Sequence, residues 1–321
     1  MRWIMNKENF SLAYFITRPL FLGLAFSLLF NQSGSDAIIS CLLGTLLGIF
    51  FIHLIHKMKF SKDNFKIIQL IIYFYFLVLA VMVLETFIGS FFLTTTPKII
   101  IIAPSLILCF YAAAKKMITI KRTTFLLLFL SIGIFSLAAI SLGNFFTIDN
   151  IAPLFIHKTS SIFKSAFIFA ILSASPHLLL KGENINFSCH LKGYLFSCLI
   201  HTLVCIVILG ALTPNVAKIY SFPEYMVLKR IKIFKFIENI ENILTAIWYI
   251  DIFVFITMIL KRIQEILKSK VLYYPSVILT VILTTYLIVD HYSRIIFLYH
   301  YTPYILLILF GIISISALKK S

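Results

Sequence analysis

The stretch Thr17–Phe30, TRPLFLGLAFSLLF, belongs to an apolar run that Pro19 and Gly23 interrupt near its middle. A second stretch, Phe169–Leu180, reads FAILSASPHLLL and is interrupted in a similar way around Pro176. Proline removes a backbone hydrogen bond and kinks or breaks a helix. Two broken helices at matching positions in the two halves of a chain are typical of transporters built from inverted repeats. Ordinary kinked packing helices are the alternative interpretation.

Ten apolar runs follow one another along the chain, most of them close to the ~20 residues that a membrane-spanning helix needs. The interrupted runs are the first and the sixth of the series. The runs are Leu12–Phe30, Ala37–His56, Ile67–Phe92, Ile99–Ala114, Thr123–Gly143, Ile162–Leu180, Leu191–Leu212, Phe236–Leu260, Pro275–Asp290 and Phe297–Leu318.

The predicted fold is therefore an all-α integral membrane protein with about ten transmembrane helices. We expect two five-helix inverted repeats with broken helices one and six. The whole chain, residues 1–321, is predicted to form a single polytopic membrane domain. Its expected parts are a first repeat over about 9–143, a second over about 160–290 and a final helix over about 297–318.

The composition supports this class, since 61% of the residues are hydrophobic and only 12% are charged. Soluble domains are roughly 45–50% apolar and about 25% charged. The net charge is +16, but the basic residues lie in the gaps between apolar runs and form no patch, which disfavours nucleic-acid binding. If the N terminus is inside, the inner segments carry more Lys and Arg than the outer ones, and this excess supports an inside N terminus. An even number of spans then places both termini in the cytoplasm.

Ionisable residues inside membrane spans are costly and often functional, and three of those in the predicted spans are singled out as candidates. Asp251 lies near the middle of the eighth run, Glu85 toward the outer part of the third, and His201 in the seventh. An acid at this depth is able to carry a proton, pair with a cation or bind an amino group. The alternative for each is a structural hydrogen bond to a neighbouring helix.

The sequence contains no nucleotide-binding loop, zinc-protease motif or serine-hydrolase signature, so no enzyme activity, cofactor or metal is predicted. The five cysteines include no CxxC pair, and most lie in apolar runs, so we expect free, buried thiols.

One predicted outer segment, residues 221–243, reads SFPEYMVLKRIKIFKFIENIENI and interleaves apolar with basic residues at near-helical spacing. Ser221 and Pro223 are suited to open a helix. This pattern predicts an amphipathic helix on the outer face. Such a helix would either pack on the bundle or serve as a lid or docking surface.

Several of these stretches resemble the B subunit of bacterial spore germinant receptors, the endospore germination permeases of the amino acid–polyamine–organocation transporter superfamily. The opening Asn9–Phe30, the following SGSDAIISCLLGTLLGIF with Asp36, the turn FFLTTTPKIII and the loop IDNIAPLF around Pro153 are similar to the family's sequences. The most specific likeness is a proline-led outer helix, a Phe-Ile-Glu-x-x-Glu segment and a tryptophan in span eight. In this chain these residues are Pro223, Phe236, Ile237, Glu238, Glu241 and Trp248.

The resemblance implies a membrane subunit that senses a small germinant, usually an amino acid, in the inner membrane of the dormant spore. It implies two protein partners, an A subunit and a lipoprotein C subunit, besides the membrane lipid. Two other roles stay open. One is a proton- or sodium-coupled amino acid permease, in which Asp251 would be a coupling site, and the other is a structural subunit with a degenerate pocket.

The resemblance also implies a ligand pocket between spans one, three, six and eight. The ends of the broken helices would hold the ligand's charged groups, because a half-helix N terminus favours a carboxylate. The residues expected to line this pocket are Leu22, Gly23, Tyr75, Ser173, Ala174, Asp251 and Phe255.

Overall fold

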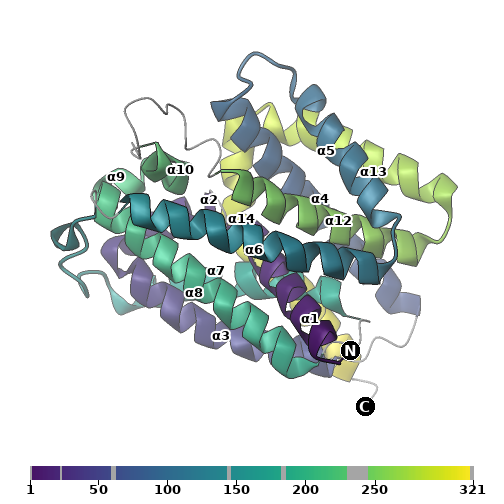
Figure 1. The fold of residues 1–321 in the computed structure, drawn as a ribbon, viewed down its shortest axis with the longest axis horizontal. Coiled ribbons are helices and arrows are strands. Elements are labelled where there is room, and N and C mark those ends of the chain that lie inside the picture. Colours follow the sequence, from purple (N-terminus) through teal and green to yellow (C-terminus); the bar gives the residue numbers. More distant parts are fainter. Residues whose placement is uncertain are drawn as a thin grey trace.

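The computed structural model describes residues 2–21, 24–58, 63–142, 146–181, 186–229 and 245–318, and within these ranges it contains helices but no strands (Figure 1). The helices, in chain order, are α1 (Arg2–Thr17), η1 (Pro19–Phe21), α2 (Leu24–Ser33), η2 (Gly34–Asp36), α3 (Ala37–Lys57), α4 (Asp63–Phe91), α5 (Lys98–Ala113), α6 (Met117–Leu142), η4 (Ile148–Asn150), α7 (Thr159–Ala174), η5 (Ser175–Leu180), α8 (Phe187–Leu212), α9 (Pro214–Ala217), α10 (Pro223–Leu228), α12 (Ala246–Leu267), α13 (Lys270–Thr284), η6 (Thr285–Val289) and α14 (Tyr292–Leu318). The five cysteines are free thiols.

Among the described residues, seven helical segments are long and apolar enough to cross a membrane. These segments are Ala25–Lys57, Lys66–Phe91, Met117–Leu142, Thr159–Leu180, Phe187–Leu212, Lys270–Val289 and Ser293–Ile312. The all-helical membrane class is thereby confirmed. The finer prediction of ten spans in two inverted repeats is not, because three of the predicted runs fall short of these criteria.

Each shortfall has a physical reason. The first run is divided between α1, which has 16 residues, and α2, whose helix continues into the second run. The fourth run is α5, also 16 residues long. At 1.5 Å per residue such helices measure about 24 Å, less than the ~30 Å of a bilayer core. Residues 236–244 of the eighth run lie outside the described residues, and its later part begins α12, in which Asp251, Lys261, Arg262 and Glu265 add charge to an otherwise apolar helix.

The first predicted interruption is present. Helix α1 ends at Thr17, directly before Arg18 and Pro19. Because Pro19 has no backbone N–H, the chain tightens into a 3₁₀ turn in which the Phe21 N–H donates to the Arg18 carbonyl at 3.0 Å. A new helix begins at Leu24. The break therefore places the side chain of Arg18 inside the bundle rather than along a regular helix face.

The second interruption is present as well. Helix α7 ends at Ala174, and η5 continues as a buried 3₁₀ segment with Pro176 in its first turn. The segment closes where the Lys181 N–H donates to the Leu178 carbonyl at 3.2 Å. The two breaks approach each other, since η5 packs against α1 and α7 packs against η1.

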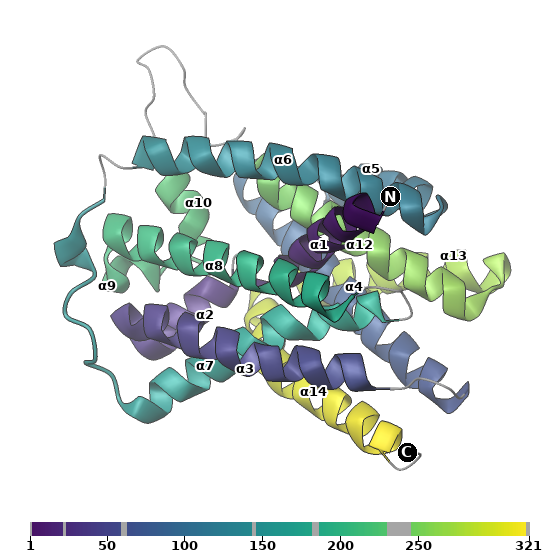
Figure 2. The same ribbon diagram turned by 60° about the horizontal axis from the view of Figure 1, so that its bottom comes forward.

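Close contacts between helices define the packing. Helices α3 and α7 lie side by side, as do α1 and α8 (Figures 1 and 2). A Cβ atom added to Gly44 of α3 would lie 2.6 Å from the Ala166 carbonyl oxygen of α7. A Cβ atom added to Gly193 of α8 would lie 2.6 Å from the Phe10 carbonyl oxygen of α1. Glycine permits this approach, as small residues do in membrane helix pairs.

The two ends of the bundle differ. Figure 2 places the start of α1 and the end of α14 toward one end, which we call the terminal end, and α9 and α10 toward the other, which we call the α10 end. At the α10 end, the buried Asp36 carboxylate accepts hydrogen bonds from the backbone N–H of Phe155 at 2.5 Å and of His157 at 2.9 Å. The His157 ring Nδ1 lies 3.2 Å from the same carboxylate. Asp36 therefore ties the turn after α2 to the loop before α7.

Candidate functional site

A buried ion pair lies at the break of the first helix. The Arg18 side chain, between α1 and η1, contacts Asp251 of α12 with 2.8 Å between Nε and Oδ2. Arg18 is 1% exposed and Asp251 is 0% exposed. Charges removed from water are costly unless they are paired and hydrogen-bonded. The pair therefore links the first helix break to α12, and separating the two buried charges would cost free energy.

The ion pair has unused hydrogen-bonding capacity on both sides. Arg18 Nη1 and Asp251 Oδ1 are buried and have no hydrogen-bond partner. The guanidinium is otherwise packed against rings, with its Cζ atom 4.6 Å from the Phe135 ring centroid and 5.1 Å from that of Tyr14. Within this ion pair, one buried donor of the cation and one buried acceptor of the anion thus remain without a hydrogen bond.

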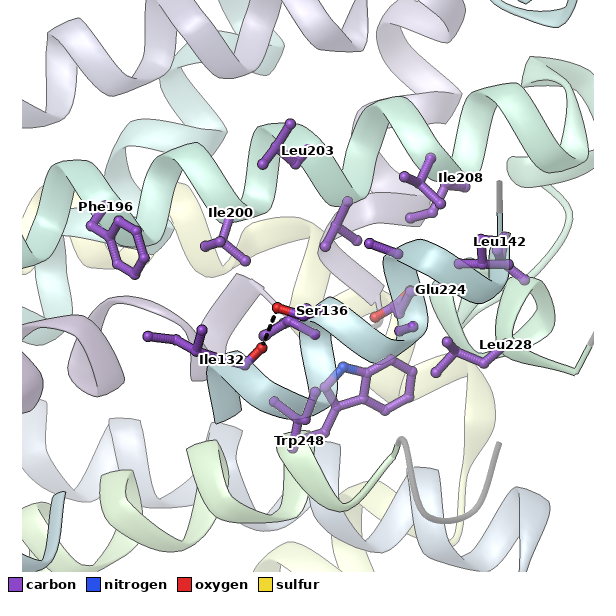
Figure 3. A pocket seen from close by; sticks show the side chains of 17 residues that line it. Ile132, Ser136, Leu142, Phe196, Ile200, Leu203, Ile208, Glu224, Leu228 and Trp248 are labelled. Carbon is purple, nitrogen blue, oxygen red and sulfur yellow. Dashed lines mark hydrogen bonds between the residues drawn. The ribbon is translucent and has the colours of Figure 1, made fainter. Parts of the chain in front are cut away.

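A cavity of about 280 Å³ lies beside this pair, between α6, α8, α10 and α12 (Figure 3). In the close-up, α8 side chains such as Leu203 lie across the cavity from Trp248 of α12. Phe135 both lines the cavity and packs against the Arg18 guanidinium, so this residue links the two. The side chains that line the cavity are Ile132, Phe135, Ser136, Ala138, Ala139, Leu142, Phe196, Ile200, Leu203, Val204, Val207, Ile208, Glu224, Val227, Leu228, Ile247 and Trp248.

The cavity lining is almost wholly apolar, with Glu224 of α10 as its acidic member among the described residues. Glu224 is 4% exposed. Trp248 lies one helical turn before Asp251 on α12, so the helix that carries the acid of the ion pair also forms a wall of the cavity. The site therefore consists of the Arg18–Asp251 ion pair and, beside it, a mainly apolar cavity.

The predicted pocket residues do not all meet at this place. Asp251 forms the ion pair, and Phe255 lies one turn further along α12, with its ring 5.8 Å from that of Phe76. The Tyr75 hydroxyl lies 2.9 Å from the Thr302 hydroxyl of α14.

The residues predicted at the second break are buried but do not line the cavity. Ser173 donates to the Phe169 carbonyl at 2.7 Å and lies 3.3 Å from the Tyr194 hydroxyl, and Ala174 ends α7. None of Tyr75, Ser173, Ala174, Asp251 and Phe255 lines the cavity.

Four other predicted residues, Leu22, Gly23, Glu238 and Glu241, lie outside the described residues.

The family-motif residues within the described ranges lie around the cavity. Pro223 begins α10, and Trp248 lines the cavity. The described part of the predicted amphipathic segment packs into the bundle, since Tyr225 is 2% exposed and its ring centroid is 4.3 Å from that of Phe91. This contact favours the packing alternative for residues 223–228.

Arg18 was not among the predicted site residues. The only signal in the sequence is a charged residue inside an apolar run, directly before Pro19. Its partner, Asp251, lies 233 positions away, so no local pattern joins the two.

The other two ionisable residues occupy separate places. Glu85 of α4 is 0% exposed and its Oε1 accepts a hydrogen bond from Thr285 of η6 at 2.7 Å, whereas its Oε2 has no hydrogen-bond partner. The η6 segment is a π-helical turn, a distortion that is frequent at functional sites. His201 packs against aromatic rings, 4.9 Å from that of Phe21, and neither of its ring nitrogens is hydrogen-bonded.

A comparison with known proteins gives one family. The sequence matches the profile of a family described as "Spore germination protein" over residues 21–315, which is most of the chain. No curated protein matches the sequence.

Proposed function

Because this chain belongs to the spore germination protein family, as the match over residues 21–315 shows, we propose that it is the ligand-sensing subunit of a germinant receptor. The family and the apolar helices together make it a germination-related, transporter-like, multi-pass membrane protein. The finer proposal concerns the ligand, its site and its effect. The observation that carries it is the buried Arg18–Asp251 pair, with one unpartnered atom on each residue beside an apolar cavity.

An α-amino acid carries a carboxylate and an ammonium group, which are suited to bind the two atoms of the pair that have no hydrogen-bond partner. Its carboxylate would accept a hydrogen bond from Arg18 Nη1, and its ammonium group would donate to Asp251 Oδ1, so that both buried orphan atoms gain a partner. A free amine or a free acid would satisfy only one of the two and leave its own charge without a counterion. The proposed site therefore prefers a zwitterion over a singly charged ligand.

The cavity would receive the side chain of the amino acid. Its lining of Ile, Leu, Val, Phe and Trp side chains favours an aliphatic or aromatic group. Phe135 lines the cavity and packs against the guanidinium, so we expect its ring to rotate or shift before one ligand reaches both. That movement offers a physical origin for signalling, because a ligand that binds only the shifted arrangement increases its population. The partner subunits, the A subunit and the lipoprotein C subunit, would then read the shift.

Binding is tested with the full-length chain in lipid nanodiscs by ligand-dependent thermal stabilisation. L-Leucine is expected to stabilise the protein, whereas its decarboxylated and its deaminated analogues are not, because each leaves one charge of the site unmatched. Asp251→Asn should abolish the effect. Asp149→Asn, which changes an exposed acid of η4, is the matched control and should retain it. Equal stabilisation by leucine and either analogue would contradict a zwitterion site.

A proton-coupled amino acid permease is the second candidate, and Glu85 favours it. A buried carboxyl group with one unpaired oxygen beside a π-helical turn is suited to take up and release a proton during transport. Deleting the gene in a spore-forming source separates the two roles. Loss of one germinant response with unchanged uptake of radiolabelled amino acids supports the sensor, and lost uptake with normal germination supports the permease. No change in either would favour a redundant or degenerate subunit.

A further inference from the structure

A chain of three hydrogen-bonded side chains joins the two helix breaks. It consists of Thr17, the last residue of α1, His177 of η5 and His190 of α8. The Thr17 hydroxyl lies 2.8 Å from His177 Nε2, and His177 Nδ1 is hydrogen-bonded to His190 Nε2. The two imidazole rings stack with 4.5 Å between their centroids. All three side chains are buried, the most accessible being His190 at 5%.

Only one assignment of donors and acceptors satisfies all the hydrogen bonds among these three side chains. The Thr17 hydroxyl donates its single proton to the Ala13 carbonyl at 2.8 Å, so it has to accept the hydrogen bond from His177. His177 therefore carries its proton on Nε2, which leaves Nδ1 as an acceptor. His190 must then donate from its own Nε2. When both rings are neutral, every hydrogen bond of the chain is satisfied and His190 Nδ1 remains the one free acceptor of the pair.

The surroundings of the pair disfavour an additional proton. Among the described residues, neither His177 nor His190 is hydrogen-bonded to or ion-paired with a carboxylate. The groups that act on His190 electrostatically are His56 of α3 and Lys181, both of which are basic. The neighbouring elements present four other polar or charged groups here. Arg18 lies between α1 and η1, and Tyr194 of α8 lies beside His177. Tyr73 of α4 is bonded to the Leu178 carbonyl, and Arg262 of α12 is bonded to the Leu179 carbonyl and paired with Glu265.

We propose that His177 and His190 form a proton-binding site that latches the two helix breaks together toward the terminal end of the bundle. With both rings neutral, the chain of hydrogen bonds holds α1, η5 and α8 in contact. A proton taken up at His190 Nδ1, the free acceptor of the pair, places a buried charge beside basic neighbours, and that charge is stabilised only where water reaches it. Acidification therefore favours an arrangement in which η5 moves away from α1. This inference does not depend on the ligand proposed above.

The test is hydrogen–deuterium exchange of the full chain in nanodiscs, followed by mass spectrometry of peptides that cover α1–η1 and η5. In the wild-type protein, lowering the pH from about 7.5 to about 5 should speed exchange about fivefold in these peptides, after correction for intrinsic exchange rates, because one or more hydrogen bonds open. His190→Gln keeps an N–H donor at similar reach but does not take up a proton in this range. Its exchange should be slow at both pH values.

His190→Leu removes the donor and should give fast exchange at both pH values. His53→Gln, at an exposed histidine of α3, is the control and should respond to acid as the wild type does. The proposal is overturned if His190→Gln keeps the full acid response, which would assign the proton to another group such as His201 or His56. It is equally overturned if His190→Leu exchanges as slowly as the wild type at about pH 7.5. Should His190→Leu fail to fold, the comparison of wild type with His190→Gln still decides.

Discussion

At the scale of single residues, the buried Arg18–Asp251 pair sets the strongest constraint. The desolvation of two charges is repaid only while both are present, and the loss of one partner leaves the other uncompensated. Because Arg18 lies at a helix break and Asp251 in the second turn of α12, this constraint also fixes where the first helix is interrupted relative to the eighth apolar run.

Asp251→Leu should destabilise the protein by about 3–5 kcal/mol, since it leaves the Arg18 guanidinium buried and unpaired. The double variant Arg18→Met/Asp251→Leu removes both charges and should recover most of that loss. Thermal or denaturant unfolding of the two proteins in the same detergent measures the difference. A double variant that is no more stable than Asp251→Leu would contradict this account of the pair.

A second prediction at this scale concerns Asp36. Its carboxylate accepts two backbone N–H bonds from the loop before α7, so Asp36→Ala leaves those donors without it. We expect faster proteolytic cleavage within residues 148–158 and a loss of stability of about 1–3 kcal/mol. Asp149→Ala removes an exposed acid of the same loop and should change neither quantity. Unchanged cleavage in Asp36→Ala would show that the loop is held by other contacts.

At the scale of helices, the approach of α3 to α7 depends on glycine. Gly44→Leu would force a side chain into the Ala166 carbonyl and the Phe169 ring, so the helices have to separate. We expect a clear loss of thermal stability, of about 1–3 kcal/mol or more. Gly133→Leu in α6 is the matched control, because a Cβ atom there has no neighbour within 4 Å. Equal stability of the two variants would contradict close packing at Gly44.

The same scale shows how much of the fold could be predicted from sequence. Helix-breaking residues act locally on backbone geometry, so Pro19 with Gly23 and the Ser173–Pro176 stretch predicted both interruptions. The number of membrane spans was harder to predict, because an apolar run in the sequence counts as a span only if its helix is long enough and carries few charges. Helix α5 has only 16 residues, and α12 carries four charged residues, Asp251, Lys261, Arg262 and Glu265. The count of ten spans therefore stays unconfirmed where seven helical segments meet both criteria among the described residues.

The candidate site was less predictable than the fold, for a related reason. Asp251 could be singled out because an acid inside an apolar run is costly wherever its partner lies. Arg18, His177 and His190 gain their meaning only from contacts between distant segments, and a single sequence contains no pattern that pairs them. Tyr75 and Ser173 were assigned by position in the family, and their hydrogen bonds to Thr302 and Tyr194 leave them outside the cavity.

At the scale of the whole molecule, the two breaks, the ion pair and the histidine chain lie along one path through the bundle. Thr17 contacts His177, and the next residue, Arg18, contacts Asp251. A shift of η1 therefore disturbs both contacts together. Thr17→Val removes the acceptor for His177. We expect it to weaken L-leucine binding by about 2–10-fold without changing the preference of the site for a zwitterion over a singly charged ligand. Titration of the purified protein measures both properties, and unchanged affinity would argue that the two contacts are independent.

The position of the Phe135 ring has a kinetic consequence. Because Phe135 packs against the guanidinium and also lines the cavity, the proposed ligand would wait for a displacement of this ring before it meets the charge. Association would then be far slower than diffusion, would respond steeply to temperature and would change little with ionic strength, because the encounter is limited by a neutral side chain rather than by electrostatic attraction.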